Sequence, residues 1–392
     1  MSNPSSKLPL STPLLPRLPV ELLHHIIEQS VPSHYHSHTY DDRQLTLRHL
    51  CLSSRLFRQI AQPILEQFVQ LVPRADRIDT WPYKECIGPT RVLSVLNDYD
   101  RPIGQVERAI LNYHNLQELH FYAHWYDRFK HRGFDISKLS SLTALTHLTI
   151  SSSDAILPLP TVFPSLRYLS LFRSNENLIA PLLRPSILPS LKVLALLYAL
   201  PCTILIDIDS LVPQLDLLIV DPDTLVRSGD KALIEQHGEK LLMDVRYDEI
   251  SGLTLPIVRH VRIRVTPAVM VDDLSVYSRE ERLSMWDPDS YNQDSEGNLS
   301  QAFDWFLENH SALKTSHKTL FLDQGLYDVL ESMEGMQDKY NHLVDMCKNA
   351  RIELMLEKQP SEKSADSSIT PELLSWIDRR KEKANVETEE VV

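Results

Sequence analysis

Closely spaced histidines are the first residues in the sequence that suggest chemistry. His34, His36 and His38 alternate in the segment HYHSH, and on a strand three imidazoles at this spacing could share a metal ion. The segment belongs to a polar insertion and has no further ligand cluster, which favours a solvated loop. A second histidine pair, in HFYAH (120–124), lacks the glutamate of the HExxH motif, so a zinc protease is not indicated.

An acidic segment, DPDSYNQDSEGN (287–298), resembles a calcium-binding loop only at first sight. Counting from Asp287, the fifth position is Tyr291 and the sixth is Asn292, where such a loop needs an oxygen ligand and a glycine. We interpret it as a flexible acidic loop between helices that a partner could order. The sequence therefore predicts no metal-binding residues.

Other catalytic signatures are missing as well. The chain has only nine glycines, and it contains neither GxGxxG nor GxxxxGKS/T, which argues against a loop that cradles phosphate. No GxSxG motif supplies a serine nucleophile, and the four cysteines lie in no nucleophile motif and form no CxxC pair. We therefore expect no catalytic residues, no cofactor and no enzymatic activity. A hydrolase or transferase with an unrecognised site is the alternative.

Length and composition favour a globular protein that binds other proteins. Of the 392 residues, 43 % are apolar and 24 % are charged, which suits two or three folding units or one elongated array. The formal charge of −13 argues against nucleic acid as a partner. The most apolar run, 193–206, contains Pro201 and is shorter than the roughly 20 residues of a membrane-spanning helix. Because prolines interrupt the first residues where a signal peptide would be apolar, we expect an intracellular protein, cytoplasmic or nuclear, with no membrane partner.

Three short helices are predicted near the start of the chain. Residues 18–30 carry apolar side chains at helical spacing, and Pro19 suits a first turn because its missing amide needs no partner there. Further helical patterns run through residues 45–52 and 57–65. Helices of this size enclose only a small core, so the unit should need a neighbour.

The same segments resemble an F-box of the form common in fungal proteins. LPVELLHHIIE and LTLRHLCLSSRLFRQIAQPIL share its leucine-proline-x-glutamate start, its aliphatic helix, a leucine-cysteine-x-x-phenylalanine-arginine-like segment and a late proline. The resemblance covers residues 18–69, with a longer insertion at 31–44 and one extra residue before the phenylalanine. It implies docking onto a Skp-type adaptor, which joins such proteins to a cullin ubiquitin ligase. The implied contacts are Leu18, Pro19, Leu22 and Ile26, with Leu50 and Phe57 from the later helices. The alternative is an ordinary helical cap that uses these residues as core.

The middle of the chain repeats one pattern, apolar-x-x-apolar-x-x-apolar-x-apolar. It occurs at 113–121, 142–150, 163–171, 188–196, 212–220 and 255–263. Repetition at periods in the twenties resembles degenerate leucine-rich repeats, in which each turn contributes a short strand. We expect FVQLV (68–72), HKTLFL (317–322) and RIELML (351–356) to add strands, and helices around 231–242, 300–313 and 325–347. The predicted fold class is α/β: a small N-terminal three-helix F-box followed by an irregular leucine-rich-repeat-like solenoid.

Successive side chains of a strand point to opposite faces, so the pattern predicts which side chains face away from the leucine core. The resulting surface has an apolar centre and a basic far end, which suits a protein target with an apolar anchor and an acidic flank. Candidate target contacts are Tyr168, Phe172, Leu197, Leu217, Arg262 and Arg264, with Tyr122 and Trp125 from the aromatic segment HFYAHWYDRFKHRGF. In the alternatives, the C-terminal helices or a long loop cover the patch, and the aromatic segment packs over the edge of the array.

The domain prediction follows from these patterns. We expect a disordered N-terminus (1–17), an F-box domain (18–69), a leucine-rich-repeat-like domain (70–357) and a polar C-terminal tail (358–392). In the tail, Thr370 and Pro371 can start a short helix, with an apolar side of Leu373, Leu374, Trp376 and Ile377, that either docks on a partner or packs back on the body. The expected function is substrate recognition for a cullin-type ubiquitin ligase, or alternatively a scaffold without ubiquitin transfer.

Overall fold

The computed structural model describes most of the segments for which the sequence predicts structure. The described residues are 18–31, 37–71, 88–97, 103–123, 133–151, 155–174, 176–197, 207–227, 230–246, 258–264, 319–323, 336–357 and 371–389. Several predictions fall outside them, namely the disordered N-terminus, the loop of His34 and His36, Trp125, the acidic loop at 287–298 and the helix at 300–313. His38, in contrast, lies in a helix.

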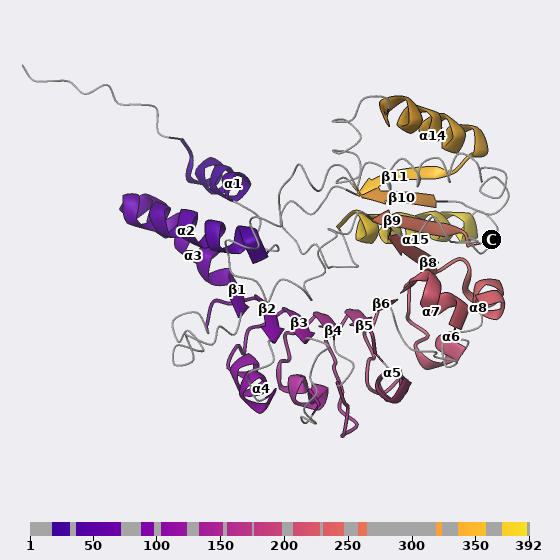
Figure 1. The fold of residues 1–392 in the computed structure, drawn as a ribbon, viewed down its shortest axis with the longest axis horizontal. Coiled ribbons are helices and arrows are strands. Elements are labelled where there is room, and N and C mark those ends of the chain that lie inside the picture. The colour runs from indigo at the N-terminus through magenta and orange to yellow at the C-terminus, as the bar shows by residue number, and fades with distance from the viewer. Residues whose placement is uncertain are drawn as a thin grey trace, which may run out of the picture.

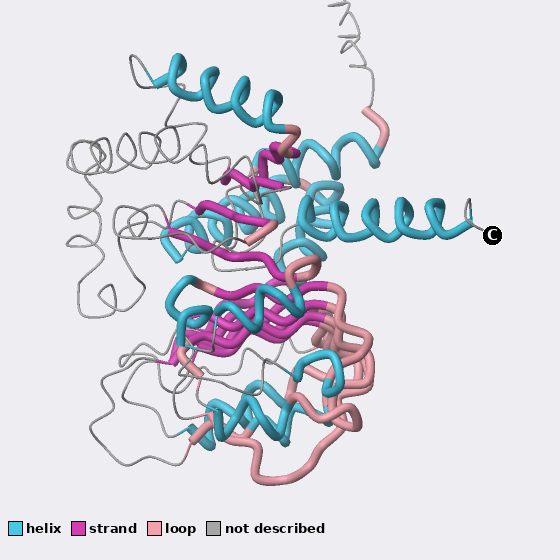
Figure 2. Tube along the Cα trace, turned by 90° about the vertical axis from the view of Figure 1, so that its right-hand side faces the viewer, coloured by secondary structure: helices cyan, strands magenta, loops and turns pink. Residues whose placement is uncertain are grey.

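One parallel sheet runs through the chain, and its strands are ordered as they are in the sequence. Within the described residues it has eleven strands, and each pairs with its sequence neighbours (Figure 1). They are β1 (Phe68–Leu71), β2 (Val92–Asn97), β3 (Glu118–Ala123), β4 (His147–Ser151), β5 (Tyr168–Phe172), β6 (Val193–Leu197), β7 (Leu217–Val220), β8 (Leu241–Arg246), β9 (His260–Arg264), β10 (Thr319–Asp323) and β11 (Glu353–Glu357). Figure 2 shows the strands stacked side by side along the molecule. The predicted α/β class is therefore confirmed.

Alternating leucines give the sheet its larger core. Leu119, Leu148 and Leu169 are register partners on β3, β4 and β5, and all are buried. Leu194 and Leu196 continue this core on β6, whereas Val193, Ala195 and Leu197 of the same strand belong to a separate cluster. We call the side of Leu194 the outer face and the side of Val193 the inner face. Because both faces of β6 and β7 are buried, these strands read as nearly continuous apolar runs.

Short helices connect the strands and cover the outer face. They are α4 (Ile103–Leu111), η3 (Ile136–Ser141), α5 (Glu176–Leu182), α6 (Ile208–Leu211), α7 (Pro222–Arg227), α8 (Asp230–His237) and α14 (Met336–Ala350). Each contributes buried apolar side chains, such as Ile110 from α4 and Leu178 from α5, to the core of the outer face. In Figure 1, α4 to α8 follow the outside of the curved row of strands.

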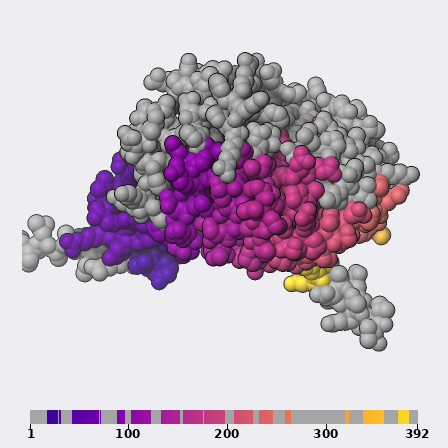
Figure 3. Space-filling view, turned by 90° about the horizontal axis from the view of Figure 1, so that it is seen from below, coloured from indigo at the N-terminus to yellow at the C-terminus, as the bar shows by residue number. Residues whose placement is uncertain are grey.

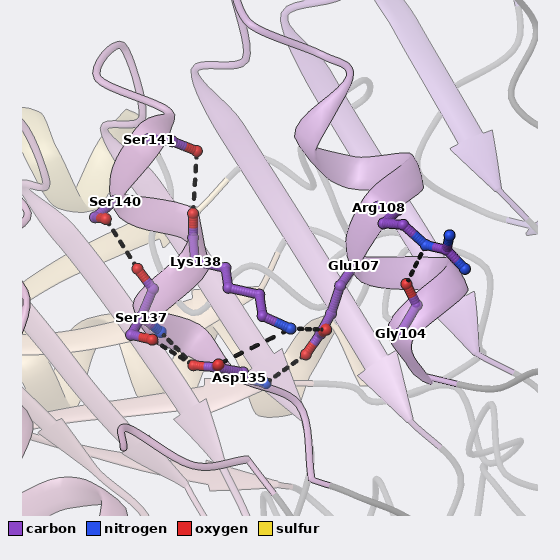
Figure 4. Close-up of polar contacts among 8 residues, drawn as sticks. All are labelled: Gly104, Glu107, Arg108, Asp135, Ser137, Lys138, Ser140 and Ser141. Carbon is purple, nitrogen blue, oxygen red and sulfur yellow. Dashed lines mark hydrogen bonds and ion pairs between the residues drawn. The ribbon is translucent and has the colours of Figure 1, made fainter. Parts of the chain in front are cut away.

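A buried carboxylate joins two of these outer elements. Glu107 of α4, which is 3 % exposed, accepts a hydrogen bond from the backbone N–H of Asp135 at 2.8 Å. It also pairs with the ammonium group of Lys138 on η3. Asp135 in turn caps η3 by accepting a bond from the backbone N–H of Ser137 at 3.1 Å (Figure 4). Since the carboxylates are hydrogen-bonded, we assign the cluster a structural role.

The prediction for residues 231–242 was partly wrong. A helix was expected throughout this segment, but α8 ends at His237 and β8 starts at Leu241. Gly238 occupies the turn between them, and a Cβ at this position would lie 2.7 Å from the carbonyl oxygen of Ile234. Leu241 and Leu242, which were expected to end the helix, instead begin strand β8 and continue the sheet.

Three helices precede the sheet. They are α1 (Val20–Ser30), α2 (Ser37–Ser53) and α3 (Arg55–Gln67), and they share a small core of Ile27, Val31, Leu47, Ile60, Ala61 and Ile64. The α2 helix begins inside the predicted polar insertion, earlier than the apolar pattern indicated. The side chain of Ser54 caps α3 by accepting a bond from the N–H of Phe57, and α3 leads directly into β1. Among the described residues, no helix is long and apolar enough to cross a membrane.

Candidate protein-binding surfaces

The N-terminal helices expose an unusual amount of apolar surface. Leu18, Leu22 and Ile26 are about half exposed, at 51 %, 50 % and 49 %. Leu45, Leu52 and Leu56 on the next two helices are also exposed. Most of the large exposed apolar side chains in the described part of the chain lie on these three helices. A concentration of this kind is typical of a surface that binds another protein.

The exposed residues form a stripe because of their spacing. Leu18, Leu22 and Ile26 are four residues apart, so they lie one above another along α1 and its entrance. Leu23 and Ile27 point instead into the core of the three helices. The helical spacing of these apolar residues predicts a single face, but they are divided between a side packed in the three-helix core and an exposed side.

The predicted adaptor contacts differ in how accessible they are. Pro19 is exposed together with Leu18, Leu22 and Ile26, at the start of α1. Leu50 and Phe57 are only partly exposed because they pack against the core of the three helices. All six residues belong to one helical unit, and four of them are open to a partner.

The inner face of the sheet is the second candidate surface, and a helix covers its apolar centre. The α15 helix (Pro371–Glu389) lies there, with Leu373, Trp376 and Ile377 buried against the sheet. The indole ring of Trp376 meets Phe321 and His260 edge-on, with ring centroids 5.1 Å and 4.9 Å away. We call the strand residues under the helix the α15 site: Val193, Ala195, Leu197, Leu217, Ile219, Leu242 and Phe321.

Charged residues surround this apolar contact. The ammonium nitrogen of Lys381 lies 2.6 Å from a carboxylate oxygen of Asp216. Arg379 lies 3.6 Å from Glu353, and Arg380 lies 3.5 Å from Glu239. The guanidinium of Arg380 also lies 4.6 Å from the centre of the Trp376 ring, and burial lowers its pKa, with Arg259 adding to the decrease and Glu353 opposing it.

This arrangement decides between the two predictions for the inner face. The alternative in which a C-terminal helix covers the patch is confirmed, and the prediction that Leu197 and Leu217 are open to a target is wrong, because they are 2 % and 0 % exposed. Tyr168 and Phe172 are partly buried at the margin of the same cluster. Tyr122 is half-buried on β3. Arg264 lies in β9, but its side chain is not among those described.

Arg262 requires a further correction. It was predicted to contact an acidic target, but it is 1 % exposed and already paired within the chain. Its Nε lies 2.5 Å and its Nη2 3.0 Å from the two carboxylate oxygens of Glu357, while Asp244 lies 3.5 Å from Nη1. Arg262 was expected to belong to a basic surface at this end of the sheet. It belongs instead to a buried ion cluster that joins β8, β9 and β11.

The polar end of the inner face contains the arrangement that comes nearest to catalytic chemistry. A ring nitrogen of His120, Nδ1, lies 3.1 Å from the hydroxyl of Thr149, and Nε2 lies 3.8 Å from a carboxylate oxygen of Glu118. His120 and Thr149 are each only 5 % exposed, so this hydroxyl is not presented to a substrate. Within the described residues, no group of three histidine, cysteine or acidic side chains could hold a metal ion.

No protein-family model matches this chain, and no curated protein is significantly similar to it.

Sequence reasoning missed the acidic residues around the α15 site. Asp216, Glu239 and Glu353 precede strands β7, β8 and β11 or begin them, and no local pattern marks them as partners of a distant helix. The only signal was in the tail, where the basic run DRRK follows the apolar residues of LLSWI.

Proposed function

We propose that the protein is the substrate-recognition subunit of a cullin-type ubiquitin ligase, with its N-terminal helices bound to a Skp-type adaptor. The observation that carries this proposal is the exposed stripe of Leu18, Leu22 and Ile26. It lies within the segment whose sequence resembles an F-box. The stripe would be costly to leave in water, at about 25 cal/mol per Å² of apolar surface.

The rest of the chain suits the second half of this function. Its leucine-patterned strands, which we interpret as leucine-rich-repeat-like turns, form a long surface on which a target protein can lie. The α3 helix continues directly into β1, so a partner held by the helices is held close to the sheet. The protein would perform no bond chemistry, because bringing the target near the ligase is sufficient to promote its modification.

Co-purification with a Skp-type adaptor tests the proposal. Leu22→Asp combined with Ile26→Asp places charges in the stripe without touching the core residues of α1. Loss of one anchor residue of an interface commonly costs about 2 kcal/mol or more, so we expect affinity to fall at least about 30-fold.

The matched control is Leu159→Asp. Leu159 is 63 % exposed and lies in the segment between β4 and β5, outside the three N-terminal helices. We expect this variant to bind the adaptor as the wild type does. Failure of the wild-type chain to bind any Skp-type adaptor would overturn the proposed function. Unchanged binding by the double variant would overturn the site assignment.

A further inference from the structure

The described contacts of the C-terminal helix with the rest of the chain lie in about the first half of its length. They run from Leu373 to Lys381, which is about two and a half helical turns. The helix continues past the sheet to Glu389 (Figure 2), and the described atoms of its first half, yellow in Figure 3, reach the surface at the edge of the molecule. The attachment is made by side chains, because the strands under the helix already pair with one another.

The α15 site has a definite chemical character. Its floor is aliphatic at β6 to β8 and ends in an aromatic ring, Phe321, at β10. The three acidic residues beside it, Asp216, Glu239 and Glu353, each pair with one basic residue of α15. The site therefore fits a helix that carries an aliphatic and aromatic side followed by a basic turn, and the formal charge of −13 favours approach of such a segment.

We propose that α15 is an internal occupant of the target-binding surface, and that the target is a protein segment of the same chemistry which displaces it. That segment is an amphipathic helix with a tryptophan or similar aromatic anchor followed by basic residues. This inference rests on the proposed function, because it names the kind of target that the sheet would present. It replaces the acidic flank predicted from the sequence with a basic one.

Release of α15 would leave the fold in place. The larger core lies on the outer face, and the residues of the α15 site take no part in it. Among the described residues, displacement therefore exposes one cluster and breaks three ion pairs without opening the strand ladder. As α15 is tethered by residues 358–370, it competes at the high effective concentration of a linked segment, which keeps weak ligands off the site.

The quantitative consequence concerns apparent affinity. A target binds only to molecules whose site is vacant, so its apparent dissociation constant equals the intrinsic value divided by the vacant fraction. Weakening the attachment of α15 should raise the affinity for an added helix by the same factor as it raises that fraction.

Binding of a labelled peptide to the full-length chain tests the proposal. The probe is a fluorescein-labelled peptide with the sequence of residues 369–389, and its binding is followed by fluorescence anisotropy. Arg379→Glu combined with Lys381→Glu removes two ion pairs through exposed side chains, so folding should be kept. We expect this variant to bind the peptide at least about tenfold more tightly than the wild type. Glu382→Ala, an exposed change on the same helix, is the matched control and should behave as the wild type.

Two further measurements, with a variant peptide and by hydrogen exchange, distinguish specific docking from non-specific hydrophobic binding. A peptide that lacks the tryptophan, with the change Trp376→Ala, should bind the released variant at least about 30-fold more weakly. Hydrogen exchange should show the amides of residues 372–382 in the wild type to be less protected than those of β6, and still less protected in the charge-reversal variant.

Equal peptide affinity of wild type and variant, or equal binding of the two peptides, would overturn the proposal. Protection of α15 equal to that of β6 in the wild type would also overturn it, because the helix would then leave only on global unfolding. Adaptor binding by the same proteins is measured in parallel. Failure of that assay alone counts against the proposed function, since the peptide assay does not involve the N-terminal helices.

Discussion

Replacing Arg262 with methionine should lower the free energy of unfolding by roughly 3–5 kcal/mol. The guanidinium is 1 % exposed and forms two hydrogen bonds to Glu357, at 2.5 Å and 3.0 Å, with Asp244 at 3.5 Å. Methionine fills a similar volume but carries no charge. The change therefore leaves two buried carboxylates, both about as inaccessible as the arginine, without their counter-ion.

The size of the effect comes from the carboxylates that remain, more than from the attraction that is lost. A pair of unit charges 4 Å apart attracts by about 4 kcal/mol at an effective dielectric constant of 20, but burial of the charges offsets much of that gain. Removal of all three charges should consequently be far less harmful than removal of one. We expect the triple variant R262M/D244L/E357L to lie within about 2 kcal/mol of the wild type.

Urea denaturation followed by circular dichroism measures these differences at constant temperature and pH. Arg184→Met, an exposed arginine, serves as the control and should change stability by less than about 0.5 kcal/mol. A loss below about 1 kcal/mol for Arg262→Met would refute the reasoning. So would a triple variant that is no more stable than the single one, because charge burial would then not be the cause.

Three further predictions follow from single residues. Ser54→Ala removes the cap of α3 and should cost about 1 kcal/mol of unfolding free energy in urea denaturation, whereas Ser54→Asp should not. Glu107→Ala leaves a buried backbone N–H without its acceptor and should cost about 1–3 kcal/mol, with Glu107→Gln intermediate, in the same measurement. Burial raises the pKa of the Cys347 thiol from 9.0 to about 11, so the thiol ionises at a lower pH in the unfolded chain than in the folded chain. The stability that this neutral thiol provides is present below pH 9 and is lost as the pH rises to about 11. Cys347→Ala should therefore lose less stability than the wild type over that interval, and an equal loss would contradict the assignment.

Most of the strands were predictable because their pattern is local, and β2 and β8 were the exceptions. Residues such as Leu119 and Phe121 alternate along one short segment, so one segment is enough to show which side chains face the core. The repetition along the chain then places β3 to β7 and β9 in order, and β1, β10 and β11 follow from shorter patterns.

The contents of the inner face were not predictable in the same way, because its contacts join distant parts of the chain. Arg262 and Glu357 are 95 positions apart, and on its own strand the arginine has the alternation expected of an exposed residue. The sequence around Trp376 likewise predicts an amphipathic helix. No residue near Trp376 in the sequence indicates that its ring packs against Phe321. The division of α1 into two apolar sides escaped prediction because a helical pattern shows which residues are apolar, whereas only the packed helices show which of them are covered.

The order of the strands has a consequence for how the protein emerges during its synthesis. Strands β2 to β11 can each pair with a neighbour that has already been made, so the ladder can grow as the ribosome advances. The aliphatic floor on β6 to β8 is complete at Leu242, yet its cover ends with Ile377. This aliphatic floor stays uncovered on the nascent chain until translation has passed that residue. A chaperone or the eventual target can therefore reach it before α15 does.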